Sequence, residues 1–218
     1  MSRPILTSLA TAILVLTMAA PAAFPQDAAP GQAASQEGTS QVVNQVQKKL
    51  RGMTTFTVWD WITFDFKDGK LTLNGYASTP TVKADAGRAV KGIKGISSVD
   101  NQIKVLPYSP MDDRIRAEVY NRIYTQPSLR KYNANQGSLG RAMGPGNSIA
   151  LAAGGVTNSP PLGYHAIHII VNKGQVTLYG VVLNKSDAQI AGMQANTAPG
   201  AFKVENDLIV QNSESQSK

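Results

Sequence analysis

The chain has 218 residues, with 21 basic and 14 acidic side chains, a formal net charge of +7 and no cysteine. Its length suits one or two small domains. The absence of cysteine excludes disulfide bonds, thiolate catalysis, cysteine-based zinc sites and a lipoprotein anchor. For an exported protein, the basic balance suits anionic phospholipid head groups, acidic cell-wall polymers or nucleic acid as partners.

The first 22 residues have the pattern of a secretory signal peptide. Arg3 precedes an apolar run over residues 5–20, and Ala20-Pro21-Ala22 supplies small residues for cleavage. The run is short for a membrane span of about 20 residues, although a retained anchor is the alternative. We expect cleavage near Ala22, which leaves a periplasmic or secreted protein. Residues 23–40 hold almost no large apolar side chain and are predicted to form a disordered tether.

Residues 41–106 are predicted to form a helix, a β-hairpin, a second helix and a third strand. Val42, Val46 and Leu50 lie on one face of the first helix. Alternating apolar residues over 56–66 predict a strand with one buried face, and a tight turn at 67–69 leads into its partner. Ser78 or Thr79 is expected to cap the second helix. The expected core positions beyond the hairpin are Val82, Ala86, Ala89, Val90, Ile93, Val99, Ile103 and Val105.

Residues 112–211 repeat this unit after a linker at 107–111. The pattern Gly-x-x-Thr-Leu-x-Gly at 69–75 returns 105 positions later at 174–180, and Gly-x-x-x-Val-x-Asn at 95–101 returns at 200–206. Such a repeat predicts two copies of one small domain. The second copy carries an insertion at about 128–163, rich in Gly, Asn and Ser, which is typical of a functional or disordered segment. A polar tail follows at 212–218.

The apolar stripes of both copies predict an α+β fold. Each unit is expected to have the order αββαβ, with two helices packed on one face of a three-stranded mixed sheet. The repeated glycines are explained by turn geometry, and the repeated asparagine by hydrogen bonds to a nearby turn, with ligand binding as the minor alternative. These motif positions are Gly69, Gly75, Gly95, Asn101, Gly174, Gly180, Gly200 and Asn206.

Few residues in the sequence support chemistry. His165 and His168 are three positions apart on a predicted strand, so they point to opposite faces and are not expected to bind one metal ion together. The serine in Gly146-Asn147-Ser148 lacks the strand-turn-helix context of a nucleophile elbow. Asp60 has no acidic partner for general acid-base catalysis. We therefore expect no catalytic site, no metal site and no cofactor.

Two groups of side chains are candidates for binding. Arg116, Tyr120 and Tyr124 form a stripe beside the core face of the first helix in the second unit, and Arg130 and Lys131 lie near its end. The alternative is a solvated basic face whose tyrosines cover the edge of the core.

Trp59 and Trp61 lie on the parity opposite the core face of their strand and are predicted to form an exposed aromatic patch. In the alternative, the second unit or the tether covers both tryptophans.

The repeated motifs resemble the BON domain (bacterial OsmY and nodulation), which occurs singly or in tandem in exported bacterial proteins. The resemblance covers residues 41–106 and 112–211. It implies an αββαβ sandwich, a periplasmic or envelope location, no cofactor and no catalytic residues. It also implies links with envelope integrity under osmotic stress and with phospholipid contact. The insertion and the weak second helix of unit two depart from the family pattern.

We therefore expect a non-enzymatic exported envelope protein that binds anionic phospholipid or a membrane surface. The predicted binding residues are Arg116, Tyr120, Tyr124, Arg130, Lys131, Trp59 and Trp61. The alternative is a module that binds an envelope protein or cell-wall polymer through the Trp59 and Trp61 face or the insertion. Nucleic acid is not expected as a partner.

Overall fold

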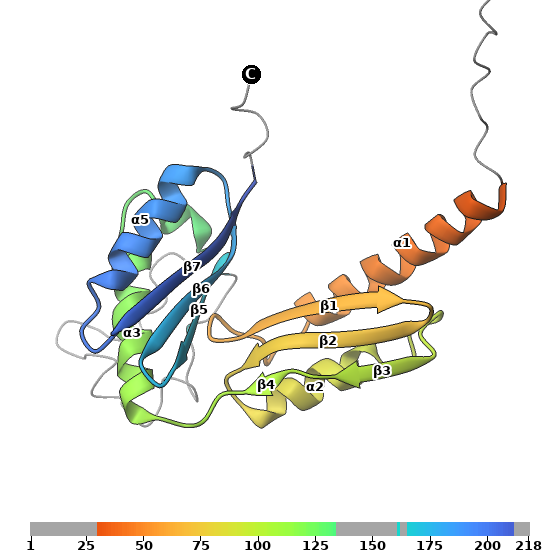
Figure 1. The fold of residues 1–218 in the computed structure, drawn as a ribbon, viewed down its shortest axis with the longest axis horizontal. Helices are drawn as coiled ribbons and strands as arrows, with labels where there is room; N and C mark the ends of the chain where they lie inside the picture. Colours follow the sequence, from red (N-terminus) through yellow and green to blue (C-terminus); the bar gives the residue numbers. More distant parts are fainter. Residues whose placement is uncertain (1–29, 134–160, 162–164, 212–218) are drawn as a thin grey trace, which may run out of the picture.

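The computed structural model describes residues 30–133, 161 and 165–211 (Figure 1). The predicted signal peptide, the first part of the predicted tether, most of the insertion and the polar tail lie outside these residues. The described parts form two αββαβ units, so the predicted α+β fold is confirmed.

Unit one contains the helices α1 (Pro30–Arg51) and α2 (Pro80–Val90) and the strands β1 (Trp61–Lys67), β2 (Lys70–Ala77), β3 (Ser98–Asn101) and β4 (Lys104–Val105). Strand β2 pairs antiparallel with β1 and parallel with both β3 and β4. Helices α1 and α2 cover one face of this sheet (Figure 1). Leu71, Leu73 and Val46 are fully buried between the layers.

Unit two contains the helices α3 (Pro110–Tyr124), η1 (Arg130–Tyr132) and α5 (Lys185–Asn196), and the strands β5 (Ile167–Asn172), β6 (Gln175–Val182) and β7 (Lys203–Val210). Strand β6 is again in the middle, antiparallel to β5 and parallel to β7. Strand β5 corresponds to β1, which makes each of them an edge strand in the order of its sheet.

Local sequence explains where the elements begin and turn. Thr79, Ser109 and Asn184 each accept a hydrogen bond from the amide three residues on, which caps α2, α3 and α5. The turn after β1 has positive φ at both Asp68 (50°) and Gly69 (76°), the geometry of a two-residue hairpin that matches the twist of the strands.

The repeated asparagines tie the last strand of each unit to its second helix. The Asn101 side chain donates to the Lys83 carbonyl at 2.8 Å and accepts from the Ile103 amide at 3.3 Å. In unit two, Asn206 makes the equivalent bonds to Ala188 and Leu208 at 2.7 and 3.4 Å. In unit one these bonds lie where the predicted third strand divides into β3 and β4.

Several predicted boundaries are wrong. Helix α3 begins at Pro110, within the predicted linker at 107–111. The first strand begins at Trp61, not at residue 56, because Asp60 folds the preceding residues into a turn: its carboxylate accepts from the amide and hydroxyl of Thr57 at 2.8 and 2.7 Å. The same carboxylate accepts from the amide and hydroxyl of Ser78 at 2.6 and 2.7 Å. Helix α1 begins at Pro30, so residues 30–40 belong to a helix and not to a tether. Alanine and glutamine have good helix propensity, and proline suits the first turn.

Candidate functional site

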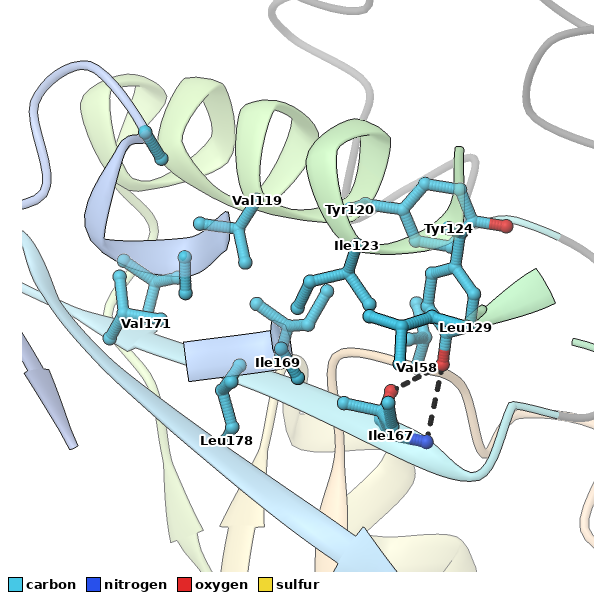
Figure 2. Packing of buried hydrophobic residues seen from close by; sticks show 14 of the residues in the cluster. Val58, Val119, Tyr120, Ile123, Tyr124, Leu129, Ile167, Ile169, Val171 and Leu178 are labelled. Carbon is cyan, nitrogen blue, oxygen red and sulfur yellow. Dashed lines mark hydrogen bonds between the residues drawn. The ribbon is translucent and has the colours of Figure 1, made fainter. Parts of the chain in front are cut away.

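The segment between α1 and β1 joins the two units. Val58 and Trp59 are 1% and 0% exposed, and both belong to the core of unit two. The Val58 carbonyl accepts a hydrogen bond from the Ile169 amide at 2.9 Å, and Trp59 packs edge-to-face on Tyr120 with ring centroids 5.8 Å apart. Figure 2 shows Val58 among Leu129, Ile167 and Ile169. The prediction that Trp59 lies in an exposed patch is therefore wrong.

Trp61 lies at the same interface. Its ring stacks on Tyr179 of β6 at 5.5 Å with an interplanar angle of 4°, and it is 5.3 Å from the His168 ring. Tyr76 of β2 also stacks on Tyr179, at 6.3 Å. The outward face of β1 thus meets the outward face of β6, so Trp61 is half-buried in a contact between units and does not form an exposed patch.

The stripe on α3 is buried, so the prediction that it forms a binding surface is wrong. Arg116, Tyr120 and Tyr124 are 1%, 2% and 7% exposed. The Arg116 guanidinium bonds the Asp113 carboxylate at 2.5 Å and the Val171 carbonyl at 2.8 Å.

The tyrosines of the stripe also bond inside unit two. The Tyr124 hydroxyl donates to the Ile167 carbonyl at 2.7 Å and accepts from the Ile167 amide at 3.2 Å (Figure 2). Tyr120 bonds His165 at 2.9 Å. Because β5 is an edge strand, its outward backbone groups need partners, and Tyr124 and Arg116 supply them for Ile167 and Val171.

Arg130 and Lys131 are exposed, but Lys131 is already paired. Its ammonium lies 2.7 Å from the Asp187 carboxylate, which also accepts from the Tyr132 hydroxyl at 2.5 Å. Burial and the bond to Asp187 raise the pKa of Tyr132 to about 12. Burial acts to raise the pKa of Asp187, but the bonds from Lys131 and Tyr132 outweigh it and lower that pKa. The start of the predicted insertion is therefore part of the folded unit.

The two histidines have structural surroundings. His165 bonds Tyr120, and the His168 ring nitrogen Nδ1 lies 3.2 Å from the Thr57 carbonyl across the interface. Burial lowers the pKa of His168 to about 4, so this ring is neutral at pH 7. Within the described residues, no group of three His, Asp or Glu side chains is placed to hold a metal ion.

Basic side chains are concentrated on and beside the helices of unit one. We define the basic helix layer as residues 38–52 and 80–95, which hold seven basic side chains and one acidic side chain. The acid, Asp85, is ion-paired with Arg88, and hydrogen bonds from Arg88 and Thr55 lower its pKa. The basic residues are Lys48, Lys49, Arg51, Lys83, Arg88, Lys91 and Lys94. None of these seven residues is among the binding residues predicted from the sequence, although Lys48, Lys49 and Arg51 lie close together in it.

An open groove of about 560 Å³ runs along the edge of β1, between this strand and α1. Val43, Gln47, Leu50 and Arg51 line it from the helix, and residues 61–66 line it from the strand. Ala166, His168, Gly180 and Val181 of unit two also line it. The sequence patterns gave no sign of this groove when each unit was considered by itself.

Comparison with known proteins identifies the repeated unit. The family model of the BON domain matches residues 60–107 and 155–212. No curated protein matches the chain. No helix among the described residues has the length and apolar character needed to cross a membrane.

Two similar solved structures are of CdsD, a structural protein of the type III secretion system of Chlamydia trachomatis. One is 15% identical, covers 80% of this chain and 94% of its own, and has a TM-score of 0.25. The other, the C-terminal domain, is 14% identical, covers 78% and 96%, and has a TM-score of 0.24. Both scores are too low to support an inference.

Proposed function

Because this chain belongs to the BON-domain family and carries the domain twice, we propose that it is a non-enzymatic envelope protein that binds anionic phospholipid surfaces. BON-domain proteins are usually periplasmic or envelope-associated, and we propose that this one supports envelope integrity or osmotic-stress tolerance. The binding surface in this proposal is the basic helix layer of unit one. The buried stripe on α3 has no part in it.

The charge of that layer is the observation that supports the proposal. Lys48, Lys49 and Arg51 are exposed in the last turn of α1, and Lys91 and Lys94 are exposed just after α2. Asp85, the only acid in the layer, is neutralised by Arg88. In unit two, the exposed bases Lys131 and Lys203 each lie within 3 Å of an acidic side chain. The other exposed bases of this unit are spread over separate elements, at Arg114, Arg130, Lys173 and Lys185.

Electrostatics gives the expected strength of binding. Each basic side chain close to an anionic membrane contributes about 1 kcal/mol, and the attraction decays within a Debye length of about 8 Å at physiological salt. Several of the layer's bases must therefore reach the surface together. Binding is expected to weaken strongly with salt because dissolved ions screen the attraction between exposed charges.

Flotation with liposomes tests the proposal. The wild-type protein should float with phosphatidylglycerol vesicles and not with phosphatidylcholine vesicles. The double variant Lys48→Glu with Lys49→Glu should lose most of this binding. The matched control, Arg114→Glu with Lys185→Glu, makes the same charge change at exposed helical positions of unit two and should still float. Equal recovery with both lipids, or equal loss in both double variants, would contradict the assignment.

The structure does not support binding of a protein or cell-wall polymer through Trp59 and Trp61, because both side chains pack in the interface between the units. Charge reversal at Arg116 is likewise not a test of lipid binding. It would place a carboxylate beside the buried Asp113 and would report unfolding.

A further inference from the structure

The edge strands β1 and β5 occupy the same place in the two repeats, but different residues cover their outer edges. In each hairpin the residues that flank the two-residue turn pair with each other, and hydrogen-bonded pairs then alternate along the ladder. Alternate residues therefore direct their backbone amides and carbonyls away from the sheet. On β5 these are Ile167, Ile169 and Val171, and on β1 they are Ile62, Phe64 and Phe66.

In unit two the protein's own residues occupy this edge. Ile167 bonds the Tyr124 hydroxyl through both its amide and its carbonyl, and the Val171 carbonyl accepts from Arg116. Between them, the Ile169 amide donates to the Val58 carbonyl. The side chains of these three β5 residues are 0% exposed and belong to the same core cluster as Val58, Trp59 and Leu129. Figure 2 shows Val58 and Leu129 beside Ile167.

Unit one lacks the cover. Val42, Val46 and Leu50 of α1 correspond to Ile115, Val119 and Ile123 of α3 in the core stripe of the first helix. The positions beside that stripe are Val43, Gln47 and Arg51 in unit one, where unit two has Arg116, Tyr120 and Tyr124. The exchange of two aromatic rings and a buried guanidinium for smaller or more mobile side chains leaves the groove of about 560 Å³.

The edge groups in this groove have no partner among the described residues. No hydrogen bond to the outward amides or carbonyls of Ile62, Phe64 and Phe66 is formed by any of them. The three side chains are only partly buried against the core of unit one. Unpaired edge groups beside a partly exposed apolar surface form a template for a further strand.

We propose that the groove between α1 and β1 binds an extended peptide segment of a partner protein, which adds to β1 as an edge strand. Residues 57–59 show what binds at the equivalent edge strand, β5, in unit two. The Val58 carbonyl accepts a hydrogen bond from the amide of Ile169, the middle of its three outward residues, and the apolar Val58 and Trp59 side chains lie in the same core as α3. Arg51 lies at the groove with no acidic partner among the described residues. The peptide is therefore expected to carry β-branched or aromatic residues and an acidic group beside Arg51.

The backbone of β1 favours a peptide over other occupants. An acyl chain would fill the apolar space but has no hydrogen-bond donor or acceptor for the edge groups. A second copy of this chain could offer residues 57–59, but these are held in its own unit two. The proposal does not depend on lipid binding by the basic helix layer.

Selection from a phage-displayed library of random decapeptides on the purified full chain tests the proposal. The first variant is Gln47→Tyr, which introduces the side chain that unit two carries at this position. The control is Gln45→Tyr, the same change at an exposed position of α1. Val43→Arg is a second groove variant if the first reduces thermal stability. Enriched peptides are then synthesised and their affinities measured for all four proteins.

The expected result is binding that both groove variants weaken by about tenfold or more and that the control leaves unchanged, a loss of about 1.4 kcal/mol. Hydrogen exchange at Ile62, Phe64 and Phe66 should slow when the peptide binds, because its backbone pairs with theirs. No enrichment, or peptides insensitive to both groove variants, would overturn the proposal.

Two other outcomes would also overturn it. If phosphatidylglycerol vesicles displace the peptide and the same vesicles bind without protecting the β1 amides, the groove takes an acyl chain. If sedimentation shows a dimer that Gln47→Tyr abolishes and Gln45→Tyr preserves, the groove holds a second copy.

Discussion

Replacing Arg116 with methionine is the most direct test of how unit two is held together. The guanidinium is 1% exposed and bonds both Asp113, at 2.5 Å, and the Val171 carbonyl on the edge of β5, at 2.8 Å. Methionine preserves most of the apolar volume of the side chain and removes both bonds. The Asp113 carboxylate, 0% exposed, then loses the guanidinium that compensates its charge.

The expected loss is large for a single substitution. Removing one partner of a buried ion pair costs about 3–5 kcal/mol, compared with about 5–15 kcal/mol for the whole stability of a typical domain. With a urea m value of about 2 kcal/mol/M, the unfolding midpoint should fall by about 2 M. Adding Asp113→Asn removes the buried carboxylate charge and should recover part of the loss.

Intrinsic fluorescence suits this measurement because the chain has two tryptophans and both lie where the units meet. Arg114→Met is the matched control, since Arg114 is exposed on the same helix and its replacement should change stability by no more than about 0.5 kcal/mol. If both variants unfold at the same urea concentration, the Arg116 pair does not stabilise unit two and the reasoning fails.

Two other predictions concern the same unit. The pKa of His168 is about 4 in the folded protein and 6.5 in the unfolded chain, so the unfolded state binds more protons between these values. Stability from this ring is present above pH 6.5 and is lost as the pH falls to 4, by about 3 kcal/mol. Urea midpoints at pH 7.5 and 4.5 should therefore differ more for wild type than for His168→Gln, and equal differences would contradict the prediction. Gly180 has φ +133°, and an added Cβ would lie 1.9 Å from the Ala166 carbonyl oxygen, so Gly180→Ala should cost about 2 kcal/mol or more in thermal unfolding. Gly38→Ala, in an open helical position, should instead stabilise the protein slightly. If Gly180→Ala unfolds at the temperature of the wild type or above it, the β5–β6 hairpin tolerates a side chain at residue 180 and the prediction is wrong.

Much of the fold follows from the sequence pattern. Helical spacing places Val46 and Leu50 in the core, and alternation places Leu71 and Leu73 there, because the backbone geometry of each element determines which side chains share a face. The repeat of 69–75 at 174–180 indicates two hairpins of one kind. These properties depend on residues close together along the chain.

The candidate binding residues could not be placed in the same way. Arg116, Tyr120 and Tyr124 lie one position from the core stripe of α3, where sequence spacing fits a solvated face and a buried one equally well. Comparing the stripe with Val43, Gln47 and Arg51 in the first unit shows that the two units differ there, but it does not show which set is covered. The carboxylate of Asp113, one helical turn before Arg116, is the sequence feature that was compatible with a buried pair.

The sequence by itself therefore determined the two αββαβ units, their order and most of their core residues. The tertiary structure decided which surfaces remain exposed. The Asp60 carboxylate bonds Thr57 and Ser78 and turns residues 57–60, which directs Val58 and Trp59 into the second unit. In that position Val58 bonds the edge of β5, whereas the edge of β1 borders an open groove. The contacts between the two units join residues up to 111 positions apart. The spacing of apolar residues within a single helix or strand does not predict such contacts.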